Sequence, residues 1–434
     1  MGKGKNGCQA AMVLDAVSLP AGVDPPQITL LQVNAAASSI SEALKAGERI
    51  AVFADYDPDG TCGAAALGLA LSDYQQQTLW GFASAQNGTG LSEDFIREAA
   101  AQDCTQLITV DLGSSGPALI ELAKELGMTI TVSDHHSPHP DADPDYHLNP
   151  QLQAPSQASG AVVAYKLALA LESELYGQPR QSTIQQGAWL AGLGARADMM
   201  DMKTSENSAL NDLNGIADNA PLGMRILQEK LGLKSLSRSN QSKISSILNL
   251  PKRCHLAKAE DAAQILMSDD PKLINDSLSN LLAVKEACDQ ASKDFGSQAA
   301  QQITAAPASR VASAIIDSQD SHLYSGYSGI VSMRMSGAAQ RPAVIFVPMN
   351  SEASMYKYSA RWTGAPDDAG EGLLTSIPAL EAVNSPHGLG PPGGHPQAMG
   401  GICRAEDIAA VTESLEAWAA NLGLSPSVLE PYGE

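Results

Sequence analysis

The sequence is short of aromatic residues, lacks any C-x-x-C pair and has no long apolar run. Its six cysteines are widely scattered, which excludes a disulfide-dense scaffold and a thiolate metal site and predicts a reduced, cytoplasmic protein. No apolar stretch approaches the roughly 20 residues that a membrane-spanning helix needs. The first residues carry Lys3 and Lys5 before a short apolar run only. We therefore expect residues 1–30 to form a loose tail and not a signal peptide.

Basic residues are also scarce, because 27 Lys and Arg stand against 48 Asp and Glu, which gives a formal net charge of −21. Proteins that coat nucleic acid need many cationic side chains to displace counterions from the phosphates. The composition therefore argues against a protein that coats nucleic acid. A polynucleotide substrate would need a local basic groove on an acidic body, and otherwise the substrate is small. Part of the acidic excess is explained if carboxylates gather around bound cations.

The first half of the chain alternates short β-like runs with helical stretches. Residues 49–54, 107–112 and 128–133 are apolar or β-branched runs that end in acidic or glycine-rich turns, and 116–127 has apolar residues at helical spacing. Strands that alternate with helices imply a mostly parallel sheet. Ligands of such sheets lie beyond the carboxyl ends of the strands, so polar residues at these ends are candidate site residues.

The second half changes character twice, and 434 residues are too many for one ordinary core. Residues 205–306 have few β-branched runs and are typical of helices, and strand patterns return between 311 and 362. We expect an α/β, two-lobed protein. A mostly parallel-sheet domain at 31–204 is followed by a helical connector at 205–306 and a smaller α/β domain at 307–434.

An acidic cluster follows the first strand, in the segment D-Y-D-P-D-G. Alternate residues of an extended segment point the same way, so Asp55 and Asp57 can converge on one point. A simpler interpretation is a polar turn in which Asp59 or Thr61 caps the next helix. A calcium-binding EF-hand loop needs a glutamate six residues after its glycine, where this chain has Ala66, and that version is excluded.

Further polar groups lie at the ends of other elements. They are Asp111 after the second strand run, Asp134, His135 and His136 after the third, and Asp198 after an apolar helical run. Each alone has an ordinary structural explanation, because helix-capping aspartates and structural histidines are common. Together with the acidic cluster they offer carboxylate and imidazole ligands without thiolates. This donor set suits Mn²⁺ or Mg²⁺ better than structural zinc.

The order of these motifs resembles the DHH phosphoesterase superfamily. D-Y-D-P-D-G, V-D-L-G-S, S-D-H-H and A-D-M-M follow one another along the chain. Further segments resemble RecJ-like members in particular. They are N-G-T-G-L-S at 87–92, H-L-N-P at 147–150, H-L-Y-S-G-Y-S-G-I-V-S-M-R at 322–334 and G-G-H-P-Q-A-M-G-G at 393–401. The similarity runs from about Ile50 to Cys403. It implies a DHH catalytic domain followed by a DHH-associated C-terminal domain.

The resemblance implies a metal centre with two divalent cations, Mn²⁺ in preference to Mg²⁺. Its ligands would be Asp55, Asp57, Asp111, His135 and Asp198. Asp111 is expected to bridge the ions and to act in catalysis with His136 and Asp134. His136 would lie close to the metals and the scissile phosphate, and Asp134 would orient the imidazoles.

The resemblance also implies substrate-binding residues. Arg361, in Y-S-A-R-W-T, and Gly394 and His395, in G-G-H-P, fall at phosphate-contacting positions of the C-terminal domain. Ser159 and Gly160 fall where the family packs a loop near the substrate phosphate.

The chain departs from the family pattern in places. Many small-substrate members carry a histidine four residues before the first motif aspartate, but this chain has Ala51 there, as RecJ-like proteins do. Asp201 stands where the family usually has proline, which leaves the local geometry open. Because the sequence continues for only about thirty residues after Gly401, we do not expect the OB-type nucleic-acid-binding domain of full-length bacterial RecJ proteins.

Three functions stay open on this reasoning. The first is a RecJ-like 5′-to-3′ exonuclease that releases mononucleotides from single-stranded nucleic acid, with DNA preferred, by two-metal hydrolysis with ions about 4 Å apart. The second is a phosphodiesterase of short oligonucleotides or cyclic dinucleotides, which the acidic charge favours and Ala51 opposes. The third is a catalytically inactive replication or repair accessory protein, which the complete set of ligand positions opposes. No membrane partner is expected.

Overall fold

The computed structural model describes residues 30–84, 90–213, 217–306, 308–318, 320–362, 372–389, 392–395 and 397–427. The expected tail up to residue 29 and positions 85–89, which include the start of N-G-T-G-L-S, lie outside the described residues. The chain divides into two compact units. The first contains the described residues up to Lys252 and Ala257–Leu282, and the second contains Arg253–Leu256 and the residues from Ala283 onward. The segment 205–306 is thus distributed over both.

The first unit is organised around a five-stranded sheet in the order β2-β1-β3-β4-β5. Its strands are β1 (Arg49–Ala54), β2 (Thr78–Phe82), β3 (Cys104–Val110), β4 (Thr129–Ser133) and β5 (Tyr146–Leu148). Every neighbouring pair runs parallel. The predicted parallel sheet is therefore confirmed.

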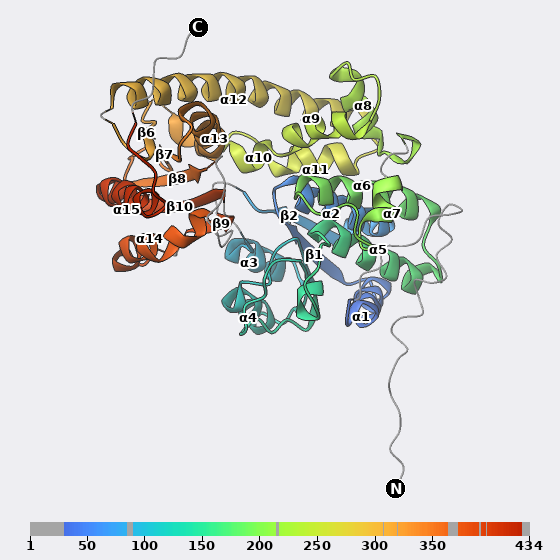
Figure 1. Cartoon of the computed structure of the whole chain (residues 1–434). Helices are drawn as coiled ribbons and strands as arrows, with labels where there is room; N and C mark the ends of the chain where they lie inside the picture. The colour runs from blue at the N-terminus through green and yellow to red at the C-terminus, as the bar shows by residue number, and fades with distance from the viewer. Residues whose placement is uncertain are drawn as a thin grey trace. The chain divides into compact units, whose positions relative to one another are not determined.

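Helices cover both faces of this sheet (Figure 1). They are α1 (Val33–Lys45), α2 (Pro58–Ala70), α3 (Glu93–Ala101), α4 (Pro117–Glu125) and α5 (Gly160–Tyr176). Phe53 and Ala51 of β1 pack into one apolar cluster with Phe95 and Ile96 of α3, and the Phe53 and Phe95 ring centroids are 4.8 Å apart. Helices α1, α2 and α5 pack on the opposite face, where α5 contacts both α1 and α2. A sheet held from both sides fixes the strand ends firmly.

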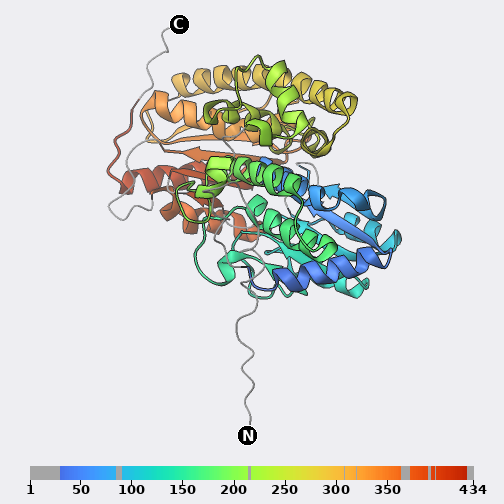
Figure 2. The same cartoon turned by 90° about the vertical axis from the view of Figure 1, so that its right-hand side faces the viewer.

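The rest of the first unit is helical, as Figure 2 shows from the side. Its helices are α6 (Gln181–Ala197), α7 (Ser208–Leu213), α8 (Leu222–Lys230), α9 (Arg238–Leu248), α10 (Leu250–Arg253) and α11 (Ala259–Met267). Helix α6 packs on α2 and α5, and α11 also contacts α2. The long helix α12 (Pro271–Ala305) begins in the first unit and ends in the second.

The second unit contains a mixed sheet in the order β6-β7-β8-β10-β9. Its elements are β6 (Ala312–Ile315), β7 (Ala343–Pro348), β8 (Met355–Arg361), β9 (Gly393–His395), β10 (Ala398–Arg404), α13 (Ser328–Ala339), α14 (Ile377–Asn384) and α15 (Ile408–Asn421). Helix α13 packs on β7 and β8, whereas α14 and α15 share an apolar cluster with buried residues of β7, β8 and β10. The predicted smaller α/β domain is confirmed.

The sequence led us to expect neither a membrane-spanning helix nor structural disulfides. In the part that the structure describes, no helix is both long and apolar enough to cross a membrane. The cysteines in that part, Cys62, Cys104, Cys254, Cys288 and Cys403, are buried and form no disulfide. A cytoplasmic location stays a prediction.

Candidate metal centre

The polar residues selected from the sequence follow three adjacent parallel strands. In the sheet register, Ala54 of β1 is opposite Val110 of β3, and Val110 is opposite Ser133 of β4. The next residue of each strand continues the ladder. The backbone N–H of Asp55 donates to Val110 O at 3.0 Å, and that of Asp111 donates to Ser133 O at 2.9 Å. These side chains therefore start from one edge of the sheet.

Asp57 is held by the turn from β1 into α2. Its carboxylate is the N-cap of α2, because Oδ1 accepts the backbone N–H groups of Asp59 at 2.8 Å and Gly60 at 3.1 Å. Pro58 occupies the first helical position, where its lack of an N–H costs nothing. Gly60 is required here, since a Cβ would lie 2.6 Å from the Asp55 carbonyl oxygen. Asp57 Oδ1 is thus engaged in capping α2, and Oδ2 can bind other partners.

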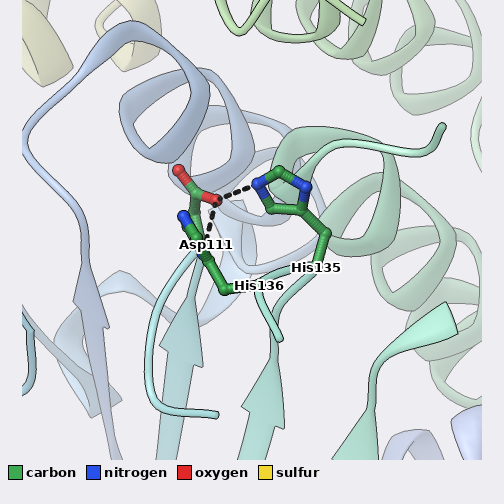
Figure 3. Close-up of side chains that lie close together, drawn as sticks. All are labelled: Asp111, His135 and His136. Atoms are coloured by element: carbon green, nitrogen blue, oxygen red, sulfur yellow. Dashed lines mark ion pairs between the residues drawn. The ribbon is translucent and has the colours of Figure 1, made fainter. Parts of the chain in front are cut away.

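Asp111 lies at the centre of the cluster. It has a left-handed backbone, with φ of 62°, which is uncommon for a residue with a side chain, and it is almost completely buried. Figure 3 shows both imidazoles directed at its carboxylate, with Oδ1 lying 3.3 Å from His135 Nε2 and 3.9 Å from His136 Nδ1. Among the described residues, none donates a well-aligned hydrogen bond to this buried oxygen. It is therefore free to accept a cation.

His135 connects Asp111 to two further carboxylates. Its Nε2 lies 3.6 Å from Asp198 Oδ2 and 3.8 Å from Asp59 Oδ2. Asp198 is the C-cap residue of α6, which brings it to the strand ends from the helical side. The structure thus brings together all five residues that were predicted as metal ligands. Asp201, the departure from the family pattern, is exposed and accepts the backbone N–H of Lys203.

Asp134 organises the loop after β4. Its Oδ1 accepts the backbone N–H of His135 at 2.7 Å and hydrogen-bonds to His136 Nδ1 at 2.8 Å, while Oδ2 accepts the Ser114 N–H at 3.0 Å. Burial opposes ionisation, yet the bonds from His136 and the backbone hold the pKa of Asp134 well below its usual range. In return, the hydrogen bond to Asp134 raises the pKa of His136 to about 9. The His136 side chain is more than half exposed.

The H-L-N-P segment supports the same loop from behind. Asn149 Nδ2 donates to the His136 carbonyl at 2.8 Å and to Ser114 Oγ at 2.9 Å. His147 Nε2 lies 2.9 Å from the same Ser114 Oγ. These contacts fix the orientation of the His136 carbonyl. They also fix Ser114, whose backbone N–H donates to Asp134.

Asp59 has a role that sequence reasoning missed. It was considered as a cap of its own helix, but it accepts hydrogen bonds from Ser159 Oγ at 2.7 Å, Gly160 N–H at 2.8 Å and Ala161 N–H at 3.2 Å. It therefore caps α5, whose first residue is Gly160. Ser159 and Gly160, predicted to contact substrate phosphate, lie against Asp59 and Asp111. Only the alternation of the three aspartates hinted that Asp59 belongs to the cluster.

Three carboxyl groups of the cluster have raised pKa values, with burial as the largest cause and repulsion among the carboxylates as a further one. Burial, followed by repulsion from Asp57, raises the pKa of Asp55 to about 7. Burial raises the pKa of Asp59 to about 6, and burial with the neighbouring carboxylates raises that of Asp111 well above its usual range. Carboxylates gathered in this way are ionised together only when cations lie among them.

The donor atoms form sets that can each hold a cation. The three sets are Asp55, Asp57 and Asp111; Asp111, His135 and His136; and Asp59, His135 and Asp198, with the ligand atoms of each set within 4.8 Å of one another. Oxygen and imidazole donors without a thiolate fit Mn²⁺ or Mg²⁺. Asp111 and His135 each belong to two of these sets, so the sets share members and form one continuous cluster.

Lys252 is a second feature that the sequence did not reveal. It lies in α10, and its Nζ donates to Asp57 Oδ2 at 2.8 Å. Burial favours the neutral form of Asp57, but this ammonium outweighs burial and holds the pKa of Asp57 below its usual range. The two residues are 195 positions apart, so no local pattern could have paired them.

The remaining predicted substrate residues belong to the second unit and form a row across its sheet. Arg361 at the end of β8 is opposite Ala398 of β10, and Ala398 is opposite His395 of β9. Gly394 precedes His395 in β9. The Arg361 guanidinium donates to the carbonyls of Ala360 at 2.8 Å and Met399 at 3.1 Å. Its position in the row is thereby fixed.

Comparisons with known proteins show what this chain is similar to. The sequence profile of the DHH family, N-terminal domain, matches residues 49–193. The single-stranded-DNA-specific exonuclease RecJ of Thermus thermophilus is 27% identical over 451 residues, which cover 95% of this chain and 62% of the relative. The enzyme of the same name from Bacillus subtilis is 25% identical over 392 residues, covering 86% of this chain and 46% of the relative. The chain spans about half the length of these curated relatives.

Solved structures show the same fold. RecJ from Thermus thermophilus in complex with Mn²⁺ superposes with a TM-score of 0.74 at 24% identity, covering 92% of this chain and 56% of that one. An exonuclease RecJ bound to manganese gives 0.71 at 24% identity, covering 91% and 95%. The two-unit architecture is thus shared along nearly the whole chain described here.

Proposed function

Since this chain is a RecJ-like protein of the DHH superfamily, we propose that it is a metal-dependent phosphodiesterase that degrades single-stranded DNA from the 5′ end. The observation that carries the proposal is the convergence of Asp55, Asp111 and His135 from three neighbouring strand ends with Asp57 and Asp198. Its products would be mononucleotides, as expected from the RecJ resemblance.

The proposed ligands of two divalent cations are those predicted from the sequence. Asp55, Asp57, Asp111, His135 and Asp198 would hold them, with Asp111 between them. As the resemblance implies, Mn²⁺ is proposed as the preferred ion and Mg²⁺ as the alternative. The similar Thermus thermophilus protein has structures with either ion. Divalent cations bound there supply Lewis-acid activation of the phosphodiester and of a water molecule.

The protein's own groups complete the site. His136, which is exposed beside Asp111 and has a raised pKa, would stabilise negative charge that develops on the phosphoryl oxygens. Asp134 holds the His136 ring in one orientation, and Ser159 and Gly160 fix Asp59 and Asp111 at the start of α5. Each group is already positioned, so little reorganisation is needed when a substrate binds.

Substrate binding is proposed for the second unit. Arg361, Gly394 and His395 would hold the phosphate next to the scissile one, and the row that they form across the sheet supports a single site. In this scheme 31–204 is the catalytic domain and 307–434 the substrate-binding domain, joined by 205–306. A protein with a net charge of −21 can still bind a phosphate through a few cationic groups at fixed positions.

The test is product analysis with Mn²⁺ on single-stranded DNA that carries a 5′ block, a 3′ block or neither. A dinucleotide and a cyclic dinucleotide are assayed in parallel. Mononucleotide release that only the 5′ block stops is the expected result, and Asp111→Ala should abolish it. Turnover of the small substrates with the long strand intact would assign the protein to short-substrate phosphodiesterases. No turnover of any substrate would favour the accessory-protein alternative.

A further inference from the structure

The position of Lys252 bears on how the metal centre is loaded. Its Nζ lies 2.8 Å from Asp57 Oδ2, and Asp57 is its sole hydrogen-bond partner within the described residues. The charge of Lys252 also acts on Asp55 and on Asp198. A positive charge supplied by the chain itself therefore stands at the Asp55–Asp57 side of the cluster.

Asp57 has only one oxygen to offer at this side. Its Oδ1 is committed to the N-terminus of α2 through the N–H groups of Asp59 and Gly60. For a cation bound by Asp55, Asp57 and Asp111, Oδ2 is the Asp57 oxygen without a backbone hydrogen bond, and Lys252 occupies it. An ammonium and a divalent ion on one carboxylate oxygen repel each other strongly in a partly buried site.

The side chain of Lys252 is suited to leaving. Its relative exposure is 49%, whereas that of Asp57 is 11%, so the ammonium reaches the cluster from the solvent side. Lysine places a compact charge on a flexible stem that is readily hydrated. Turning outward to water costs this side chain far less than displacement would cost the buried aspartates.

We infer that Lys252 is a resident competitor of the divalent cation at the Asp55–Asp57 side of the centre. The ammonium neutralises this side until a cation binds, and the cation must displace it from Asp57 Oδ2. Lys252 thus sets the affinity of the centre for its metal and is not itself a ligand. The inference rests on the proposed metal centre, and it is tested without any nucleic acid.

The first measurement is Mn²⁺ titration, with free Mn²⁺ followed by its electron paramagnetic resonance signal. Lys252→Met keeps the length of the side chain and removes its charge, so we expect Mn²⁺ to bind roughly tenfold more tightly. Lys252→Arg should bind Mn²⁺ like the wild type. Lys258→Met, at an exposed lysine of the same unit, is the matched control and should change nothing. Equal or weaker Mn²⁺ binding by Lys252→Met would overturn the inference.

Melting temperature gives a second readout that a purely structural lysine would not reproduce. With chelator, Lys252→Met should melt lower than the wild type, because its acidic cluster has lost a counter-charge. With saturating Mn²⁺ the difference should disappear, so that Mn²⁺ raises the melting temperature more in the variant. The same deficit under both conditions would show a packing role and contradict competition. If neither protein binds Mn²⁺, the metal centre itself is wrong.

Discussion

Gly160, the first residue of α5, lies so close to Asp111 that a Cβ at this position would overlap the Asp111 carboxylate. The Gly160 N–H also donates to Asp59 at 2.8 Å. One residue without a side chain thus determines how closely α5 approaches two members of the cluster.

Gly160→Ala should therefore damage the centre more than the fold. Overpacking of this kind costs about 1–3 kcal/mol, and a displacement of the reacting groups by about 1 Å can lower the rate about 100-fold. We expect weaker Mn²⁺ binding and a large loss of turnover in a folded protein. Gly296→Ala is the control, because Gly296 lies in α12 with no atom near its Cβ position, and helix propensity predicts slight stabilisation. Similar effects of both substitutions would refute the proposed role of Gly160.

Asp55 gives a prediction for pH. Its pKa is about 7 in the folded protein against 3.8 ordinarily, so the folded state binds this proton more tightly than the unfolded chain. The stability that this proton contributes is fully present below about pH 3.8 and is lost as pH rises through about 7. With chelator present, the free energy of unfolding of Asp55→Asn should therefore rise relative to that of the wild type as pH increases between these two values. The rise should be at most about 1.4 kcal/mol per pH unit.

Denaturant unfolding at a series of pH values measures this difference. Asp269→Asn replaces an exposed aspartate of the same unit and should show no such trend. A constant difference between Asp55→Asn and the wild type across the range would contradict the raised pKa.

The pair of Asp134 and His136 predicts a change in histidine titration. Asp134→Asn removes the carboxylate whose hydrogen bond and charge raise the pKa of His136 to about 9, so this pKa should fall towards 6.5. Because the folded-state pKa is the higher one, the stability contributed by the His136 charge is present below about pH 6.5 and is lost as pH rises through about 9. Nuclear magnetic resonance of the imidazole protons, with chelator, reports the pKa directly.

A matched pair provides the control. His139 and Asp141 lie 3.8 Å apart on the surface, and the Asp141 side chain is 82% exposed. Asp141→Asn should leave stability unchanged. An unaltered His136 titration in Asp134→Asn would mean that the hydrogen bond between them does not control the charge.

Arg361 should affect nucleic-acid binding and not metal loading. Arg361→Ala is expected to raise KM for single-stranded DNA about tenfold and to reduce the salt dependence of binding by about one counterion. Mn²⁺ affinity should not change. Arg404→Ala alters a surface arginine of the same unit and should have little effect on KM. Equal changes in KM for the two variants would show that Arg361 is not part of the substrate site.

The sequence predicted the strand-end residues because their signals are local. The run from Arg49 to Ala54 is buried almost throughout and breaks into acidic residues at once, and the structure ends β1 at the expected residue. In a parallel sheet, knowing the strand ends is enough to expect that the residues after them meet.

The features that the sequence did not predict depend on distant pairings. Asp59 meets Ser159 across 100 positions, and Lys252 meets Asp57 across 195. Neither partner differs in its local pattern from an ordinary capping aspartate or a surface lysine. Such contacts follow from the packing of α5 and α10 in the folded unit, which hydrophobic periodicity does not encode.

The most direct test of the metal centre is an anomalous-scattering map from crystals grown with Mn²⁺. We predict manganese peaks on both sides of the Asp111 carboxylate, with Asp55 and Asp57 coordinating at one and His135 and Asp198 at the other. The Lys252 ammonium should then have left Asp57 Oδ2. An empty map at Asp111, with Lys252 still bonded to Asp57 at saturating Mn²⁺, would contradict the account.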